Sequence, residues 1–382
     1  MKPIWLLLLA LASTGCTSGG GDKGVFDMRA ATPAPSVSSP PHSAETKIGS
    51  GSVRIAALLP FSATGAVAER ARDVRDGATL AVEHLGKDVL TVTLEDSSAG
   101  AKSAALKAMG EGAAAIIGPF EAPAAADVAT IRGGKLSPIF LLADGVPGAA
   151  SIYDVALQNG VSAAAGARAL AKVGARNFVL LSPEGFGAAA TEKAVDFAAA
   201  DHGGRIVAKA RYSQDRASVL KAVDTIFAVT SSPDAVIIAG GAFDPAMIVE
   251  AVRAKGGARI KIAGNNSWRS SDLSNPLFNG VLIADLDEAE LSTVASTFRA
   301  RFGRELTPLA AYAYDVVALS SGIARALGRD GFARVIVEDS KGFRGATGTF
   351  RFRGDGSCGR LLALYRIDKG RLKKIQPPPA IF

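Results

Sequence analysis

The chain has 382 residues, of which 48% are hydrophobic and 21% are charged, and its formal net charge at pH 7 is +7. Its lysine and arginine residues are spread along the chain without interleaved aromatic residues, which argues against a nucleic-acid partner. Two cysteines and three histidines are too few for a disulfide framework, and they disfavour a metal site or a Ser-His-Asp triad. We therefore expect a protein without cofactor or metal, and not an enzyme.

Residues 1–15 have the pattern of a secretory signal peptide. A lysine precedes a short apolar run over residues 4–12, which is too short to span a bilayer as a helix. The run ends in small residues directly before Cys16, a pattern that resembles a bacterial lipobox, although Ser13 stands where a leucine is usual. The resemblance implies lipidation of Cys16, and Thr17 in place of aspartate implies an outer-membrane anchor facing the periplasm. An ordinary secretory signal with a chance cysteine remains the alternative.

Residues 16–52 are predicted to form a disordered, lipidated tether. The segment is rich in Gly, Ser, Pro, Ala and Thr and shows no apolar periodicity. Such a segment cannot bury enough apolar surface to offset the entropy lost on ordering. We expect it to act as a spacer between the membrane and the body of the protein.

Short apolar runs alternate with longer alanine-rich helical patterns throughout the body. This alternation predicts parallel sheets covered by helices on both faces. The last two runs flank Gly354-Asp355-Gly356 and predict a C-terminal β-hairpin. The predicted fold is therefore α/β, with two Rossmann-like lobes joined by a hinge. Strands are expected at residues 53–59, 89–94, 114–117, 137–142, 177–181, 205–212, 235–239, 260–263 and 281–284.

The order of these elements predicts how the chain divides between the lobes. We assign residues 53–158 and 285–340 to an N-terminal lobe. Residues 159–284 and 341–375 are assigned to a C-terminal lobe.

Four segments in order resemble type I periplasmic binding proteins of the leucine/isoleucine/valine-binding class. The first, residues 53–65, reads VRIAALLPFSATG; the others are RDGATLAV at 75–82, GAAAIIGP at 112–119 and PLAAYAYDVVAL at 308–319. The resemblance covers the chain from residue 53 onward. It implies a receptor that captures a small solute, such as an amino acid, and delivers it to the permease of an ABC transporter.

Two further segments resemble a lipoprotein branch described as penicillin-binding protein activators. They are GFRGATGTFRF at residues 342–352 and the loop NNSW at 265–268. This second resemblance implies a partner in the cell wall, namely a peptidoglycan-synthesising penicillin-binding protein. Solute receptor and activator both remain open functions, and a peptidoglycan-derived ligand is compatible with either.

Ligands of open α/β sheets bind beyond the carboxyl ends of the strands, which in a two-lobed fold means the cleft between the lobes. The loops expected there supply the candidate binding residues. These are Ser62, Thr64, Glu121, Ala143, Asp144, Glu184, Phe186, Phe243, Asn265 and Trp268.

The chemistry of these candidates departs from that of an amino-acid receptor. The resemblance implies hydroxyl groups on the loops after the third and fourth strands, and this chain largely lacks them. Glu121, Asp144 or Glu184 could hold an ammonium group, or could simply cap turns. Phe186 and Trp268 could stack on a ligand or plug the interface between the lobes.

Overall fold

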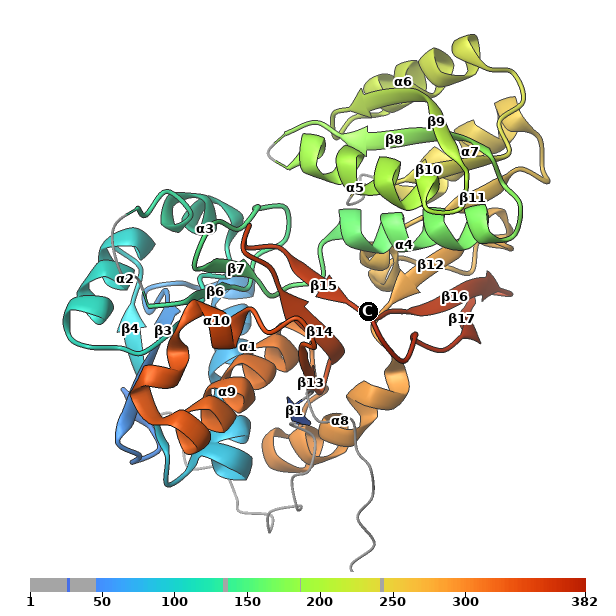
Figure 1. Cartoon of the computed structure of the whole chain (residues 1–382). Helices are drawn as coiled ribbons and strands as arrows, with labels where there is room; N and C mark the ends of the chain where they lie inside the picture. The colour runs from blue at the N-terminus through green and yellow to red at the C-terminus, as the bar shows by residue number, and fades with distance from the viewer. Residues whose placement is uncertain (1–25, 28–45, 133–136, 186, 241–243) are drawn as a thin grey trace, which may run out of the picture.

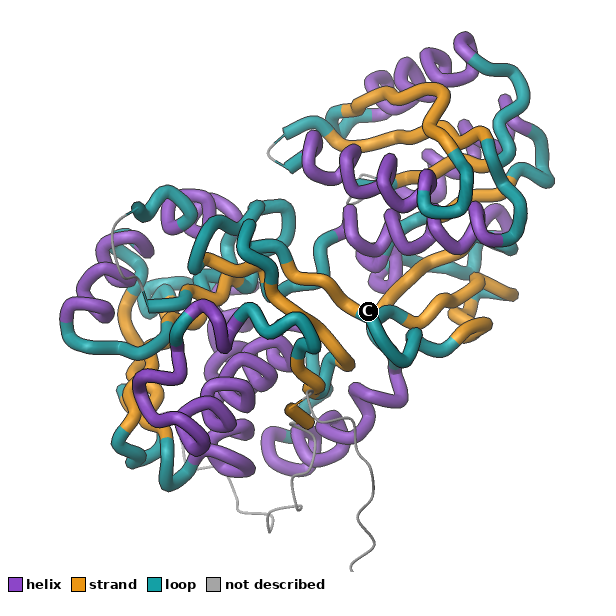
Figure 2. The backbone as a smooth tube through the Cα atoms, in the orientation of Figure 1, coloured by secondary structure: helices purple, strands orange, loops and turns teal. Residues whose placement is uncertain are grey.

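Two α/β lobes make up the body of the protein in the computed structural model (Figure 1). The structure describes residues 26–27, 46–132, 137–185, 187–240 and 244–382. Within these ranges, no helix is long and apolar enough to cross a membrane. Figure 2 shows helices on both sides of the strands in each lobe, as expected for parallel sheets.

The first lobe is built on a six-stranded sheet in the order β2-β4-β3-β5-β6-β7. All neighbouring strands are parallel except the edge strand β2, which pairs antiparallel with β4. The strands are β2 (Lys47–Ile48), β3 (Val53–Leu59), β4 (Leu90–Asp96), β5 (Ile116–Ile117), β6 (Ile139–Leu141) and β7 (Ile152–Asp154).

Side chains of β3 alternate between two hydrophobic cores, because successive residues of a strand face opposite sides of the sheet. Ile55 and Ala57 belong to the core under α1 and α9, while Ala56 and Leu58 belong to the core under α2 and α3. The helices of this lobe are α1 (Gly65–Ala81), followed by a π-helical turn over Val82–Gly86, α2 (Ala101–Gly110), α3 (Ala122–Val128), α8 (Glu288–Phe302), α9 (Pro308–Leu327), a 3₁₀ turn over Gly328–Phe332, and α10 (Arg334–Val337).

The second lobe is built on a seven-stranded sheet in the order β17-β16-β12-β11-β10-β8-β9. Its first five strands in sequence pair in parallel with one another. The last two, β16 and β17, add an antiparallel edge next to β12. The elements are α4 (Asn159–Lys172), β8 (Asn177–Pro183), α5 (Ala188–Ala200), β9 (Arg205–Tyr212), α6 (Arg216–Val229), β10 (Ala235–Ile238), α7 (Pro245–Gly256), β11 (Lys261–Ala263), 3₁₀ turns over Asn266–Ser270 and Pro276–Phe278, β12 (Leu282–Asp285), β16 (Ala363–Asp368) and β17 (Arg371–Gln376). The predicted fold class, two lobes with parallel sheets, is confirmed.

A small sheet near the hinge differs from the predicted C-terminal hairpin. The turn at residues 354–356 is present, but it joins β14 (Gly348–Phe352) to a short β15 (Cys358–Arg360), which pair antiparallel. The chain then leaves this sheet, and β16 pairs with β12 of the second lobe. The apolar Leu361 and Leu362 therefore form a third crossing between the lobes.

The strands of this small sheet pack on the first lobe, although we expected residues 341–375 in the C-terminal lobe. Phe352 lies 5.3 Å from Phe140 and 5.0 Å from Tyr153, measured between ring centroids. Both partners are buried residues of the first lobe's sheet. The alternating pattern showed where strands occur, but side-chain packing decides which lobe they join. The remaining strand of this group is β13 (Phe343–Gly345), which pairs with β14.

Two short strands fall in the range where a tether was predicted. Lys47–Ile48 forms β2, and Phe26–Asp27 forms β1, which pairs in parallel with β13 of the small sheet. Cys16 lies outside the described residues. The other cysteine, Cys358, is buried in β15, and burial raises the pKa of its thiol to about 11.

Candidate functional site

A cavity of about 280 Å³ lies between the lobes, at the carboxyl ends of their strands. The first lobe contributes the loop after β6, the last residue of β7 and the β14–β15 turn. The second lobe contributes the N-termini of α4 and α5 and the ends of β8 and β10. The lining residues are Asp144, Gly145, Pro147, Gly148, Asp154, Gln158, Asn159, Gly160, Val161, Pro183, Glu184, Gly187, Ala188, Ala190, Thr191, Ala194, Ala239, Gly240, Asp355 and Ser357.

Gln158 holds the loop after β6 against the start of α4. Its Nε2 donates to the carbonyl oxygen of Ala143 at 3.1 Å, and its Oε1 accepts from the backbone N–H of Gly145 at 2.7 Å. The backbone N–H of Asn159 donates to Oδ1 of Asp144 at 3.3 Å, so a carboxylate lies at the positive end of this helix. One wall of the cavity is therefore fixed by a side chain at the first crossing between the lobes.

Asp154 ends β7 and lies in the wall of the cavity. The side chain is buried, with 6% of the residue exposed, and its Oδ1 has no hydrogen-bond partner among the described residues. Burial, together with the nearby carboxylates of Asp355 and Asp144, raises the pKa of Asp154 to about 8, although the backbone N–H of Gly148 opposes the shift. The described residues thus leave a buried carboxyl group in the cavity wall incompletely satisfied.

The β14–β15 turn reaches the cavity because glycine allows a very close approach of two backbone segments. Gly356 has a φ of +85°, and a Cβ atom there would lie 2.3 Å from the backbone of Ala149 and of Ile152. The carbonyl oxygen of Gly356 accepts from the backbone N–H of Asp154 at 2.9 Å. This contact places Asp355 beside Asp154.

The titratable groups of the cavity wall are all acidic. Of its described residues, Asp144, Asp154, Glu184 and Asp355 carry carboxyl groups, and none is a lysine, arginine or histidine. Asp144 is exposed at the surface, and desolvation by its neighbours raises its pKa, although hydrogen bonds from the backbone N–H groups of Asn159 and Gly145 oppose the shift. Burial opposes ionisation of Asp355 as well, yet hydrogen bonds from Ser357 and the charge of Arg353 lower its pKa overall. The cavity therefore combines ionised and incompletely satisfied carboxyl groups.

The structure brings two of the eight candidate residues that it describes into the cavity. Asp144 and Glu184 lie in its wall, and Glu184 also accepts a hydrogen bond from the Ser213 hydroxyl at 2.9 Å. Phe186 and Phe243 lie outside the described residues, so their placement stays a prediction.

The remaining first-lobe candidates lie elsewhere. Ser62 and Thr64 are exposed and do not line the cavity, and the backbone N–H of Ser62 donates to Ser98 Oγ at 3.0 Å. Glu121 forms an ion pair with Arg70. Ala143 is buried and contributes only its carbonyl oxygen, to Gln158.

Asn265 and Trp268 are buried in the interior of the second lobe. The Asn265 amide donates to the carbonyl oxygens of Ile238 at 3.1 Å and Gly240 at 2.7 Å, and its Oδ1 caps the following 3₁₀ turn. Trp268 is fully buried in the core of the second lobe, with its ring 5.8 Å from that of Phe278. The expectation that Trp268 stacks on a ligand or plugs the lobe interface is therefore wrong.

Several residues that line the cavity are not among the candidates predicted from the sequence. Asp154 lies in a three-residue strand, Ile152–Asp154, too short to show a period. Asp355 lies in Gly354-Asp355-Gly356, a sequence that predicts a hairpin turn. Gln158 did carry a signal, because it is the last residue before the predicted change from the N-terminal to the C-terminal lobe. The predicted position of the first crossing between the lobes therefore marks part of the site.

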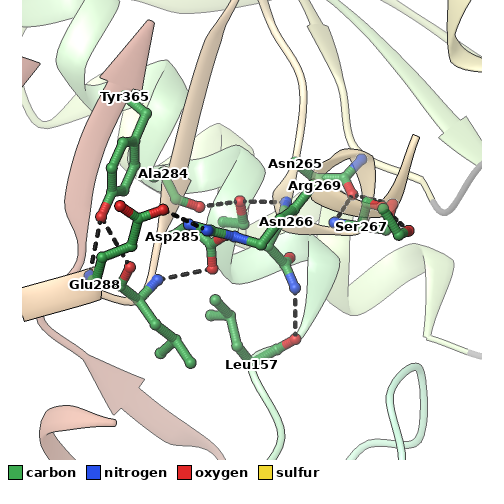
Figure 3. A network of polar contacts seen from close by, with 12 residues as sticks. Leu157, Asn265, Asn266, Ser267, Arg269, Ala284, Asp285, Glu288 and Tyr365 are labelled. Carbon is green, nitrogen blue, oxygen red and sulfur yellow. Dashed lines mark hydrogen bonds and ion pairs between the residues drawn. The ribbon is translucent and has the colours of Figure 1, made fainter. Parts of the chain in front are cut away.

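A polar network ties the crossing segments together on the side of the second lobe (Figure 3). Arg269 Nε donates to Asp285 Oδ2 at 2.6 Å, and its Nη1 donates to Glu288 Oε1 at 2.7 Å. The Tyr365 hydroxyl donates to the carbonyl oxygen of Leu286 at 3.1 Å. The second crossing between the lobes runs from β12 into α8. The network thereby joins it to β16, the strand that follows the third crossing.

The same network reaches the first crossing. The backbone N–H of Asn266 donates to Ser162 Oγ at 2.9 Å, and the Ser162 hydroxyl donates to the carbonyl oxygen of Ala284. The Asn266 amide approaches the carbonyl oxygen of Leu157 at 3.4 Å (Figure 3). The loop at 265–268, a candidate ligand contact by sequence, thus lies at the hinge.

The architecture defines the class of protein: two α/β lobes, three crossings and a cavity that both lobes line, which is a ligand-binding arrangement. The family model described as periplasmic binding protein matches residues 52–371. The chain belongs to this family, and the family implies a periplasmic location. No curated protein matches the sequence significantly.

Solved structures with the same fold come from several bacteria. A putative branched-chain amino acid ABC transporter protein of Rhodospirillum rubrum has a TM-score of 0.67 and 18% identity, over 85% of this chain and 99% of its own. A leucine-binding protein of Thermotoga maritima has a TM-score of 0.58 and 19% identity, over 84% and 97%. A Rhodopseudomonas palustris solute-binding protein, solved with 3,4-dihydroxybenzoic acid, has a TM-score of 0.60 and 17% identity, over 85% and 96%. The predicted resemblance to type I periplasmic binding proteins is confirmed.

Proposed function

We propose that this protein binds a small solute in the cavity between its lobes, without catalysis, and presents it to an ABC transporter in the membrane. The observation that carries the proposal is a cavity whose wall comes from both lobes, so that a ligand there would link them. Its volume of about 280 Å³ is near the lower end of the range for small-molecule sites, and so favours a compact ligand. The solved relatives that bind amino acids or aromatic acids support the proposal by analogy.

Thermal unfolding in the presence of candidate ligands tests this proposal. The panel contains amino acids, diamines, small peptides, muropeptides and aromatic acids. A ligand that binds only the folded state and is present at about 100 times its Kd should add about 2.7 kcal/mol to the free energy of unfolding. Isothermal titration calorimetry then gives the affinity.

Two neighbouring alanines of α5 provide a matched pair for locating the bound ligand. Ala190 lines the cavity, whereas Ala189 is exposed on the same helix and does not line it. Ala190→Trp should fill the cavity and abolish the ligand-induced shift, while Ala189→Trp should preserve it. Loss of the shift in both variants, or in neither, would place the ligand elsewhere.

Activation of a peptidoglycan-synthesising penicillin-binding protein is the second candidate function. It is favoured because the positions expected to grip an amino acid do not offer hydroxyl groups: Glu121 is paired with Arg70, and Ala143 is buried. The two functions separate experimentally. Specific retention of a penicillin-binding protein on the immobilised protein, with no ligand from the panel causing a shift, would favour the activator.

We further propose that Cys16 carries a lipid that anchors the protein to the outer membrane. The support is the apolar run that ends in small residues before this cysteine. Two or more acyl chains hold a protein on a membrane far better than one. Cys16→Ser should move the protein from the outer-membrane fraction to the soluble periplasmic fraction. Unchanged fractionation of this variant would argue for an ordinary secretory signal.

A further inference from the structure

The cavity between the lobes carries a charge pattern that points to one class of ligand. Four carboxyl groups line it, three of them on loops or turns and one, that of Asp154, at the end of β7, and no basic side chain is among its described lining residues. An anion such as a benzoate would have to enter a wall that offers carboxyl groups and no basic side chain among its described residues. A cation would be attracted by the same wall.

Asp154 is the carboxyl group of this cavity that most needs a ligand, because it is buried and one of its oxygens has no partner among the described residues. It is 94% buried, it lines the cavity, and its Oδ1 has no hydrogen-bond partner within the described parts of the chain. Burying a carboxyl oxygen without a partner costs free energy unless a ligand supplies the missing donor. An ammonium group has three N–H donors and a positive charge. It would donate a hydrogen bond to Oδ1 of Asp154 and stabilise the ionised form of this carboxyl group.

The acceptors around Asp154 suit an organic cation better than a metal ion. No group of three or more Asp, Glu, His or Cys side chains in the described ranges is arranged to hold a metal. The Oδ1 of Asp355 already accepts from the backbone N–H of Ser357 at 2.9 Å and from its hydroxyl at 2.7 Å. Asp144 accepts from the N–H of Asn159. These hydrogen bonds fix the carboxylates at a distance around Asp154 rather than on one common centre.

The first lobe alone supplies Asp144, Asp154 and Asp355, and the second lobe supplies Glu184. A ligand with one cationic end at Asp154 therefore faces a further carboxylate across the cleft. This arrangement fits a compact molecule with two cationic groups, or with one cationic group and neutral donors.

We infer that the cavity selects a small alkylammonium ligand, with Asp154 as its principal acceptor, and that it rejects aromatic and other carboxylate anions. This inference rests on the proposed function and deepens it by naming the ligand class. A free diamine and the side chain of a cationic amino acid share the required chemistry, and the test distinguishes them.

Calorimetric titration of the full chain with four probes tests the inference. The probes are 1,4-diaminobutane, its neutral isostere 1,4-butanediol, lysine and benzoate. We expect diaminobutane, lysine or both to bind, and butanediol and benzoate to bind at least tenfold more weakly. Binding of diaminobutane without lysine identifies a polyamine-type ligand, and tighter binding of lysine identifies an amino acid.

Asp154→Asn should weaken the binding of the cationic probe at least tenfold. The matched control is Asp224→Asn, because Asp224 is an exposed aspartate of α6 paired with Lys255, away from the cavity wall. The control should bind as the unaltered protein does. Far-UV circular dichroism and thermal unfolding of each variant exclude loss of folding as the cause.

The outcomes separate this inference from the proposed function. If benzoate or another anion binds the cavity and the cations do not, the ligand class is wrong and solute binding stands. If Asp154→Asn leaves cation binding unchanged, Asp154 is not the principal acceptor and the inference is overturned, while solute binding stands. If no ligand of any charge binds the unaltered protein in this or the earlier panel, both are wrong.

Discussion

Asp315→Ala should destabilise the protein by about 3–5 kcal/mol, the range for removing one partner from a buried charged network. Asp315 is fully buried on α9 and accepts hydrogen bonds from the N–H of Ala346 at 2.6 Å, the N–H of Thr347 at 3.0 Å and the Thr347 hydroxyl. Thr347 Oγ1 accepts in turn from Arg360 Nη1 at 2.6 Å. The alanine variant would leave these donors and the buried Arg360 without compensation.

Urea unfolding followed by circular dichroism measures this effect. Thr347→Val is a milder second variant, expected to cost about 1–3 kcal/mol, because it keeps the shape and removes one hydroxyl. The control is Asp224→Ala, which removes an exposed carboxylate from a surface ion pair and should cost less than about 1 kcal/mol. Equal losses for Asp315→Ala and Asp224→Ala would contradict a stabilising role for the network.

Asp154→Asn should stabilise the protein at alkaline pH while it weakens cation binding. The pKa of Asp154 is about 8 in the folded protein, against an ordinary value of 3.8. Between pH 4 and pH 8 the folded protein therefore holds a proton that the unfolded chain releases, so the contribution of this group to stability falls as the pH rises. Asparagine does not titrate and escapes this loss.

The size of the effect follows from the same shift. Each pKa unit corresponds to about 1.4 kcal/mol, and relaxation of the cavity reduces the effect, so we expect a gain on the order of 3 kcal/mol at pH 8 and almost none near pH 4. Urea unfolding of the variant and the unaltered protein across this range measures the difference, with Asp224→Asn as control. A difference that does not change with pH would show that the folded protein does not hold this extra proton on Asp154.

Much of the fold could be predicted because its signals are local. The segment at 308–319, one of the four that carry the family resemblance, begins α9, Pro308–Leu327, which has proline at its first turn and Thr307 as its N-cap. The strand expected at 53–59 is β3, whose near-continuous apolar sequence is typical of a parallel strand buried on both faces. Strands of two or three residues, such as Ile152–Asp154, have too few positions to establish a period.

Motif residues far apart in the sequence meet in the network around Asp315. Asp315 lies in the segment at 308–319, and Gly345 and Thr347 lie in the segment at 342–352. A Cβ atom on Gly345 would lie 2.4 Å from Asp315 Oδ1, so glycine is what lets the β13–β14 turn reach the carboxylate. The two segments carry separate family resemblances, and in the structure they meet and join α9 to the small sheet.

The candidate site was only partly predictable, for a physical reason. Parallel strands predict which edge of a sheet faces the cleft, and Asp144 and Glu184 follow from that rule alone. Whether a loop side chain points into the cleft or into its own lobe depends on packing partners distant in sequence. Asn265 and Trp268 turned inward because backbone carbonyls and Phe278 lie beneath them.

The sequence by itself determined the alternation of strands and helices, the two-lobed α/β class and the family, because these depend on the periodicity of apolar residues and on short motifs. The tertiary structure alone decided that β13–β15 pack on the first lobe, that the chain crosses between lobes at Leu361 and Leu362, and that Asp154 and Asp355 converge with Asp144. These features depend on contacts between segments distant in sequence, some of them more than 200 residues apart (Arg360 Nη2 to the Val155 carbonyl oxygen spans 205 residues). No local pattern carries that information.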